Sequence, residues 1–305
     1  MYYESMQALV GQTPLVKLGH FDLPSDVSLF AKLELYNPSG SVKDRTGRYM
    51  VEAAERHGEL RPGGTIVLGT AGNTGLGIAF AALNKGYRVI FTVPEKFSIE
   101  KQIFMHALGA EIIHTPLEEG MLGANRRAAE LHAQIPGSVV LDQFSDQSNP
   151  QAHYETTGPE IYQDLNAKID YFVAGAGSGG TFTGIARYLK QHLPNLQAVL
   201  ADPVGSTIGG GTHADYLIEG IGNDFIADTL DMSLVDKIYK ITDAEAFDAA
   251  RLAARKEGIF AGSSSGAALS AALKLIQDGA RGNIVVVFPD RGDRYFSKNL
   301  FDTDF

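Results

Sequence analysis

The sequence contains no cysteine and no tryptophan. Without cysteine, disulfides, thiolate metal ligands and a cysteine nucleophile are all excluded. Basic residues do not gather either, since the longest cationic runs are the pairs Arg126-Arg127 and Arg255-Lys256 and the formal net charge is −10. Nucleic-acid binding needs Lys and Arg clustered on one face, so we expect no nucleic-acid partner. The eight histidines are scattered without ligand-like spacing, and we predict no metal site.

Long apolar runs are missing as well. No stretch approaches the roughly 20 apolar residues that span a bilayer. The first residues, Met1-Tyr-Tyr-Glu-Ser5, lack the basic and apolar regions of a signal peptide. We therefore expect a cytoplasmic protein without a membrane partner. The 305 residues, 44% of them hydrophobic, are enough for two domains or one large one, with a sizeable core.

From about residue 65 onward, short β-branched runs alternate with longer stretches of helical periodicity. We expect strands at residues 65–68, 88–93, 111–114, 139–141, 171–174, 198–201, 237–241 and 284–288. We expect helices at residues 46–56, 75–83, 99–108, 123–134, 181–192, 244–257 and 266–277. This alternation predicts an α/β fold whose parallel sheets are covered on both faces. The turn-rich residues 143–151 are the expected crossing between two such units.

The glycine-rich stretch Gly175-Ala-Gly-Ser-Gly-Gly-Thr181 follows one predicted strand and begins a predicted helix. Free amides at a helix N-terminus suit a phosphate, and Ser178 and Thr181 add hydroxyl groups. The stretch also satisfies G-x-G-x-x-G, and Asp202 lies 22 residues beyond Gly180. Because this is the dinucleotide fingerprint, a nicotinamide-dependent oxidoreductase stays open at this point.

Lys43 lies in Asn37-Pro-Ser-Gly-Ser-Val-Lys-Asp-Arg45, after a turn and at the start of a predicted helix. The helix dipole disfavours a positive charge there, and partial burial favours the neutral amine that imine formation needs. The alternative is an ordinary solvated lysine in the first helical turn.

Two further turns have ligand-binding character. Gly69-Thr-Ala-Gly-Asn-Thr-Gly75 follows a predicted strand, and its amides and hydroxyls suit a carboxylate, although Asn73 and Thr74 are also common capping residues. Ala261-Gly-Ser-Ser-Ser-Gly266 precedes a helix, where serines are by default cap residues. Ligands of parallel α/β folds bind at such turns.

With these motifs the sequence resembles the cysteine synthase and cystathionine β-synthase family of fold type II pyridoxal-phosphate enzymes. The resemblance runs from Leu9-Val-Gly-Gln-Thr-Pro14 to Tyr295, with the motifs in the family's order. It implies two three-layer α/β/α domains with parallel-type sheets and the cofactor, pyridoxal 5′-phosphate, in the cleft between them. It also implies a smaller mobile domain at residues 45–145, a larger domain of residues 1–44 and 146–305, and a homodimer.

The resemblance implies a role for each matching residue. Lys43 matches the Schiff-base lysine, Asn73 the asparagine bound to the cofactor's phenolic oxygen, and Ser264 the serine facing its pyridine nitrogen. The expected phosphate cradle is Gly177, Ser178, Gly179, Gly180 and Thr181. The expected substrate contacts are Thr70, Ala71, Gly72, Thr74, Gln143 and Gly220. A structural hydrogen bond is the expected role of His153.

The implied reaction is β-replacement through an aminoacrylate, with serine and O-acetylserine both open as the first substrate. Two acidic residues in Glu219-Gly-Ile-Gly-Asn-Asp-Phe225 resemble the cystathionine β-synthase form of this segment and favour homocysteine, giving cystathionine. Cysteine synthase, which uses sulfide, is the alternative. The chain lacks the N-terminal haem-binding and C-terminal regulatory segments of animal cystathionine β-synthases, so we expect a compact bacterial type.

One residue departs from the family pattern, because Ala71 stands where the family usually has serine. The nicotinamide hypothesis leaves Lys43, the Asn73 turn and the Ser264 turn unexplained. A non-catalytic protein of the same fold has no chemical need for the Lys43 amine.

Overall fold

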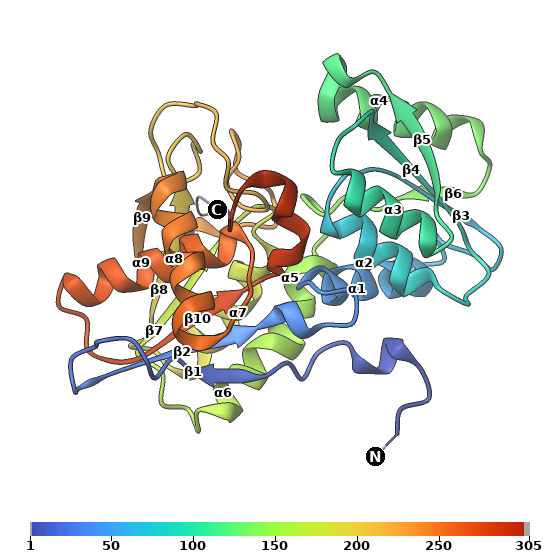
Figure 1. Ribbon diagram of the computed structural model, residues 1–305. Helices are drawn as coiled ribbons and strands as arrows, with labels where there is room; N and C mark the ends of the chain where they lie inside the picture. The colour runs from blue at the N-terminus through green and yellow to red at the C-terminus, as the bar shows by residue number, and fades with distance from the viewer. Residues whose placement is uncertain (1, 302–305) are drawn as a thin grey trace. The chain divides into compact units, whose positions relative to one another are not determined.

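The computed structural model describes residues 2–301 (Figure 1). The chain forms two compact units, each with its own sheet. Unit 1 comprises Met1–Val10 and Lys43–Asn149, and unit 2 comprises Gly11–Val42 and Pro150–Phe305. The mobility expected of residues 45–145 stays a prediction.

Unit 1 contains a four-stranded parallel sheet with the order β5-β4-β3-β6. Its strands are β3 (Thr65–Gly69), β4 (Arg88–Pro94), β5 (Glu111–Thr115) and β6 (Ser138–Val140). Its helices are α1 (Lys43–Arg56), α2 (Asn73–Ala82), α3 (Ile99–Ala107) and α4 (Gly120–Gln134). Ile66 packs with residues of α1 and α2, whereas its neighbour Val67 packs with Ala128 of α4. The period-2 alternation of the strands therefore buries both faces of the sheet.

Unit 2 contains a six-stranded sheet with the order β1-β2-β10-β7-β8-β9, parallel except for the edge strand β1. Its strands are β1 (Leu15–Lys17), β2 (Val27–Leu33), β7 (Tyr171–Gly175), β8 (Gln197–Pro203), β9 (Lys237–Ile241) and β10 (Gly282–Phe288). Helices of the second half of the chain are α5 (Ser148–Ala152), the π-helix His153–Thr157, α6 (Gly158–Asp164), α7 (Gly180–His192), α8 (Asp243–Glu257) and α9 (Ser263–Gln277). Short 3₁₀ helices are Met6–Leu9, Glu34–Tyr36, Leu117–Glu119, Met232–Leu234 and Gly292–Lys298.

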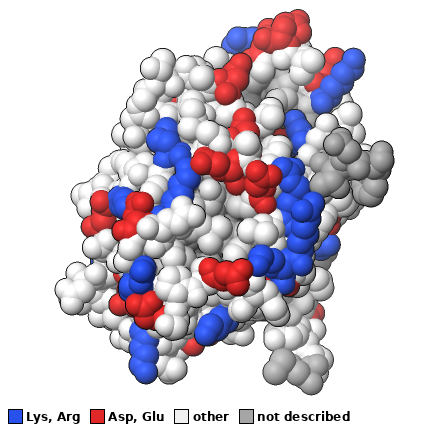
Figure 2. All heavy atoms as spheres, turned by 60° about the vertical axis from the view of Figure 1, so that its left-hand side comes forward, with Lys and Arg blue, Asp and Glu red and all other residues white. Residues whose placement is uncertain are grey.

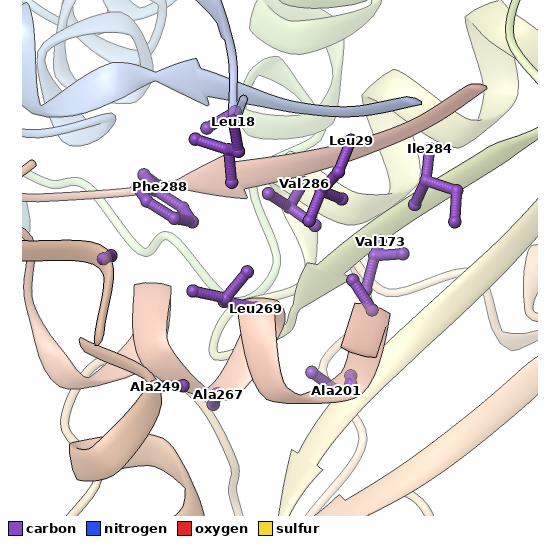
Figure 3. Close-up of a cluster of buried hydrophobic side chains, with 14 of the residues drawn as sticks. Leu18, Leu29, Val173, Ala201, Ala249, Ala267, Leu269, Ile284, Val286 and Phe288 are labelled. Atoms are coloured by element: carbon purple, nitrogen blue, oxygen red, sulfur yellow. The ribbon is translucent and has the colours of Figure 1, made fainter. Parts of the chain in front are cut away.

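The larger core of unit 2 lies between its sheet and helices α8 and α9 (Figure 3). Val173 and Val286 belong to this core, together with Leu269 of α9. Their strand neighbours Phe172 and Val285 belong to a second core on the opposite face, which includes residues of α7. Unit 2 is therefore also a three-layer α/β/α structure, and the predicted fold class is confirmed.

Strand β2 was not anticipated from the sequence, because a lysine interrupts its apolar pattern. Lys32 is fully buried, and its Nζ donates to the carbonyl oxygen of Thr13 at 2.7 Å. The same Nζ forms ion pairs with Glu160 at 2.9 Å and Asp164 at 3.4 Å. Buried charges need such partners, and these come from distant parts of the chain.

Within residues 2–301, no helix combines the length and apolarity that crossing a membrane requires. Figure 2 shows Lys and Arg side chains lying beside Asp and Glu side chains on the face that it draws.

Candidate active site

In unit 1 the candidate residues follow the carboxyl ends of two adjacent strands. The turn that contains Thr70 and Asn73 follows β3, and Gln143 follows β6. These strands are paired in parallel, so their carboxyl ends lie at the same edge of the sheet. Thr74 Oγ1 donates to Gln143 Oε1 at 2.7 Å, and the amide of Gly72 donates to Thr70 Oγ1 at 3.4 Å. The structure therefore brings the predicted carboxylate-binding residues together.

Lys43 is the first residue of α1, and Asn73 is the first residue of α2. The two helices touch through their backbones. A Cβ atom on Gly77 would lie 2.1 Å from the carbonyl oxygen of Lys43, and one on Gly47 would lie 2.3 Å from the carbonyl carbon of Gly77. Only glycine permits this approach, which holds Lys43 about one helical turn from Asn73.

A buried asparagine joins α1 to the Gln143 turn. Asn149 is fully buried, accepts a hydrogen bond from Thr46 Oγ1 at 3.2 Å and donates to the carbonyl oxygen of Gln143 at 2.8 Å. Lys43, the Asn73 turn and Gln143 are thus parts of one connected arrangement in unit 1. Ala71 lies in that turn with its methyl group buried in the unit 1 core.

In unit 2 the glycine-rich turn, residues 175–181, connects β7 to α7. Helix α7 begins at Gly180, and its N-cap Gly179 has φ of +87°. The first backbone bond into the helix runs from the amide of Thr183 to the carbonyl oxygen of Gly179 at 2.9 Å. The earlier amides of the helix have no intrahelical acceptor by geometry and carry its positive dipole end, which suits an anion.

His153 supports this turn from within unit 2. The ring is fully buried, and its nitrogens lie 2.9 Å from Thr157 Oγ1 and 3.2 Å from Thr181 Oγ1. These contacts agree with the structural role expected of His153.

Residues 220–230, here called the strap, cross the glycine-rich turn. A Cβ atom on Gly177 would lie 2.4 Å from the carbonyl oxygen of Gly220, so the two backbones are in direct contact. Gly222 N also donates to the carbonyl oxygen of Ala176 at 2.8 Å. Gly220 therefore lies at the glycine-rich turn.

Ser264 lies in the first turn of α9 and is almost fully buried. Its neighbour Ser263 accepts a hydrogen bond at Oγ from the amide of Glu219 at 3.0 Å. Because residue 219 directly precedes the strap, the Ser264 turn and the glycine-rich turn contact the same segment. The carboxylate of Glu219 lies 3.4 Å from Lys298 Nζ, and Asp224 within the strap is exposed.

Tyr295 and Asp290 were missed as a pair by sequence reasoning. The Tyr295 hydroxyl donates to Asp290 Oδ2 at 2.5 Å, and burial raises the pKa of Tyr295 well above its usual value, so the phenol keeps its proton. The carbonyl oxygen of Asp290 accepts from the amide of Gly262 at 3.0 Å, which supports the Ser264 turn.

Asp202, the acidic residue of the dinucleotide fingerprint, forms hydrogen bonds within the protein and does not face a ligand site. It is buried and accepts hydrogen bonds from Lys240 Nζ at 2.6 Å and from the amide of Gly209 at 2.9 Å. A ribose-binding carboxylate must face a ligand, so this arrangement does not fit the nicotinamide hypothesis. Among residues 2–301, no group of three or more His, Asp and Glu side chains is arranged to hold a metal ion.

Comparison with known proteins gives consistent matches along the chain. Residues 6–290 match the family model described as "Pyridoxal-phosphate dependent enzyme". An O-acetylserine dependent cystathionine beta-synthase of Bacillus subtilis is 49% identical over 295 residues, covering 96% of each chain. A cysteine synthase of Helicobacter pylori is 44% identical over 304 residues, covering 99% of this chain and 100% of the relative. The crystal structure of an O-acetylserine dependent cystathionine beta-synthase from Helicobacter pylori has a TM-score of 0.92 and 43% identity, covering 99% of this chain and 100% of the other.

Proposed function

Since this chain belongs to the family of pyridoxal-phosphate dependent enzymes, and within it to the cysteine synthase and cystathionine β-synthase type, we propose that it condenses O-acetylserine with homocysteine. The products are cystathionine and acetate. O-acetylserine is named for the Bacillus relative, and the observation that carries the choice of homocysteine is the position of Glu219. Its backbone lies between the glycine-rich turn and the Ser264 turn, where a substrate ammonium would meet its carboxylate.

The residues of unit 2 fit the cofactor. The glycine-rich turn offers backbone amides at the positive end of α7, and the hydroxyls of Ser178 and Thr181 supplement them. In this proposal the turn holds the phosphate and Ser264 holds the pyridine nitrogen. A hydroxyl there, unlike a carboxylate, leaves that nitrogen largely unprotonated. When bound, pyridoxal phosphate supplies a carbonyl carbon that amines attack and a ring that withdraws electrons from the substrate's α-carbon.

Unit 1 supplies the reacting amine and the substrate grip. Lys43 Nζ would hold the cofactor covalently and, as a free amine, would accept the substrate's α-proton. Asn73 would donate a hydrogen bond to the cofactor's phenolic oxygen. Thr74 and Gln143, already in contact with each other, orient the substrate carboxylate together with the amides of the turn after β3. Groups that hold the substrate in one orientation increase the rate at which its β-leaving group departs.

The double variant Glu219→Gln, Asp224→Gly tests the choice of thiol. If these carboxylates hold the homocysteine ammonium, kcat/KM for homocysteine should fall about tenfold or more, because one charge-assisted hydrogen bond contributes about 1.5–3 kcal/mol. The value for sulfide, which has no ammonium, should stay unchanged. Steady-state assays with saturating O-acetylserine measure both.

Lys298→Ala is the matched control, because Glu219 also forms an ion pair with Lys298. Removal of this competing cation should leave homocysteine use unchanged or improve it. If Lys298→Ala instead reproduces the loss seen in the double variant, Glu219 serves the ion pair and the proposed anchor is wrong. Equal losses with homocysteine and sulfide would also contradict it and would point to a shift of the strap.

Cysteine synthase is the second candidate function, favoured by the cysteine synthase of Helicobacter pylori among the relatives. It requires only that sulfide replace homocysteine at the same site. A wild-type kcat/KM for sulfide that exceeds the value for homocysteine would favour this candidate.

Ala71→Ser tests the departure in the substrate turn. The new hydroxyl would enter a buried position. Unless it finds a hydrogen-bond partner there, it should lower the free energy of unfolding by about 1–3 kcal/mol. We expect the ratio of kcat/KM for serine to kcat/KM for O-acetylserine to change, because a substrate carboxylate or leaving group would be that partner. An unchanged ratio with a lower melting temperature would mean that Ala71 serves packing alone.

A further inference from the structure

Three consecutive carbonyl groups of the glycine-rich turn accept hydrogen bonds from the strap. The bonds run from Gly222 N to Ala176 O at 2.8 Å, from Asn223 Nδ2 to Gly177 O at 2.8 Å, and from Thr229 Oγ1 to Ser178 O at 2.5 Å. The first comes from the main chain and therefore uses no side-chain group of residue 222. The other two depend on the identity of Asn223 and Thr229.

The strap also explains why the turn is rich in glycine. Cβ atoms added at the three alternate glycines would each collide with the strap. The contacts would be Gly175 with Ile221 Cγ2 at 2.6 Å, Gly177 with Gly220 O at 2.4 Å, and Gly179 with Leu230 Cβ at 2.3 Å. Gly175 and Gly177, two of the glycines that mimic a dinucleotide fingerprint, thus make room for a segment of the same chain.

Fixing a carbonyl group also fixes the next amide. The peptide unit is planar and trans, so the carbonyl of one residue and the N–H of the next point in opposite directions. Carbonyls of residues 176–178 that face the strap therefore direct the amides of residues 177–179 away from it. We propose that Asn223 and Thr229 are positioning residues that hold these amides ready for the cofactor's phosphate. This rests on the part of the proposed function that assigns the phosphate to the glycine-rich turn.

Asn223 is itself anchored on the side away from the turn. Its amide donates to Ser206 Oγ at 3.1 Å, and its carbonyl oxygen accepts from Ser206 Oγ at 3.0 Å and from Thr207 N at 2.8 Å. Ser206 is fully buried, and its carbonyl oxygen accepts from Lys240 Nζ at 2.6 Å. The backbone of Asn223 is therefore fixed by hydrogen bonds while its side chain binds the turn. These hydrogen bonds lead through Ser206 to Lys240 and Asp202.

The test compares retention of pyridoxal phosphate by variants of the holoenzyme. Asn223→Ala and Thr229→Val each remove one hydrogen bond, and each should raise the dissociation constant about fivefold in equilibrium dialysis. The ³¹P resonance of the bound phosphate should shift in both. Thr229→Ser keeps the hydroxyl and should restore both properties. Ile226→Ala changes an exposed strap residue, 54% accessible, and should behave as the wild type.

Unchanged retention and ³¹P resonance in both Asn223→Ala and Thr229→Val would overturn the inference. So would an equal loss in Ile226→Ala or in Thr229→Ser, because the loss would then report folding of the strap. If Asn223→Ala does not fold, the comparison of Thr229→Val with Thr229→Ser alone tests the positioning role. None of these measurements involves a thiol, so failure of the homocysteine proposal leaves the result intact. A loss in Gly177→Ala without any loss in the Asn223 and Thr229 variants would keep the phosphate site and reject the positioning role.

Discussion

Lys43→Ala will abolish covalent attachment of pyridoxal phosphate and lower turnover by a factor of roughly 10³ to 10⁴. The effect is large because, in the proposed mechanism, one amine performs both tasks, attachment of the cofactor and transfer of the substrate's α-proton. Borohydride reduction followed by peptide mass spectrometry detects the attachment, and a steady-state assay with O-acetylserine measures the turnover. The variant should still bind the cofactor non-covalently, because the proposed phosphate site belongs to unit 2.

Two controls separate chemistry from charge in this experiment. Lys190→Ala removes a lysine near the end of α7 that pairs with Asp236, and it should retain attachment and activity. A small primary amine added to Lys43→Ala should restore part of the proton transfer. Near wild-type turnover of Lys43→Ala without added amine would exclude the proposed mechanism.

Gly177→Ala will release the cofactor, with an increase in its dissociation constant of roughly 10- to 100-fold, because overpacking costs about 1–3 kcal/mol. The added methyl group would lie 2.4 Å from the carbonyl oxygen of Gly220 and cannot be accommodated by a side-chain rotation. The φ of Gly177 lies outside the left-handed region, so the effect is steric and not conformational. The loss of cofactor affinity is measured by equilibrium dialysis of the variant and by its melting temperature with and without pyridoxal phosphate.

Gly19→Ala is the matched control. Gly19 also belongs to unit 2, its φ is not left-handed, and a Cβ atom there would have no heavy atom within 4 Å. This variant should keep wild-type affinity and stability. If Gly177→Ala binds the cofactor as tightly as Gly19→Ala, the glycine-rich turn does not hold the phosphate.

The fold was predictable where the signal is local. Strands of residues such as Ile284–Phe288 are continuous apolar runs, and the turns after β3 and β7 carry glycine and hydroxyl residues that stand out in any reading. Strand β2 was missed because Lys32 breaks its pattern, and the carboxylates that neutralise Lys32 lie more than a hundred residues away. A pattern within one segment contains no information about such a partner.

The candidate site divides in the same way. Its turns were identified from composition, and their residue roles came from the resemblance. Asn223 looks in the sequence like an ordinary turn asparagine, because its bond to Gly177 spans 46 residues. Tyr295 likewise shows its bond to Asp290 only in the folded chain. Contacts of this kind depend on packing, which one sequence does not reveal.

The contact between the strap and the glycine-rich turn also separates two kinds of position in the strap: residues that contact the turn, and residues whose side chains face solvent. Residues 220–223 contact the turn, whereas the side chains of Asp224, Phe225 and Ile226 are exposed. In the proposed function, substitutions at Glu219 and Asp224 would change what the second substrate meets, while the hydrogen bonds from Gly222, Asn223 and Thr229 to the turn would stay in place. Under the proposed function, a preference for one thiol is therefore free to diverge between descendants of a common enzyme while the contacts that shape the glycine-rich turn are inherited unchanged.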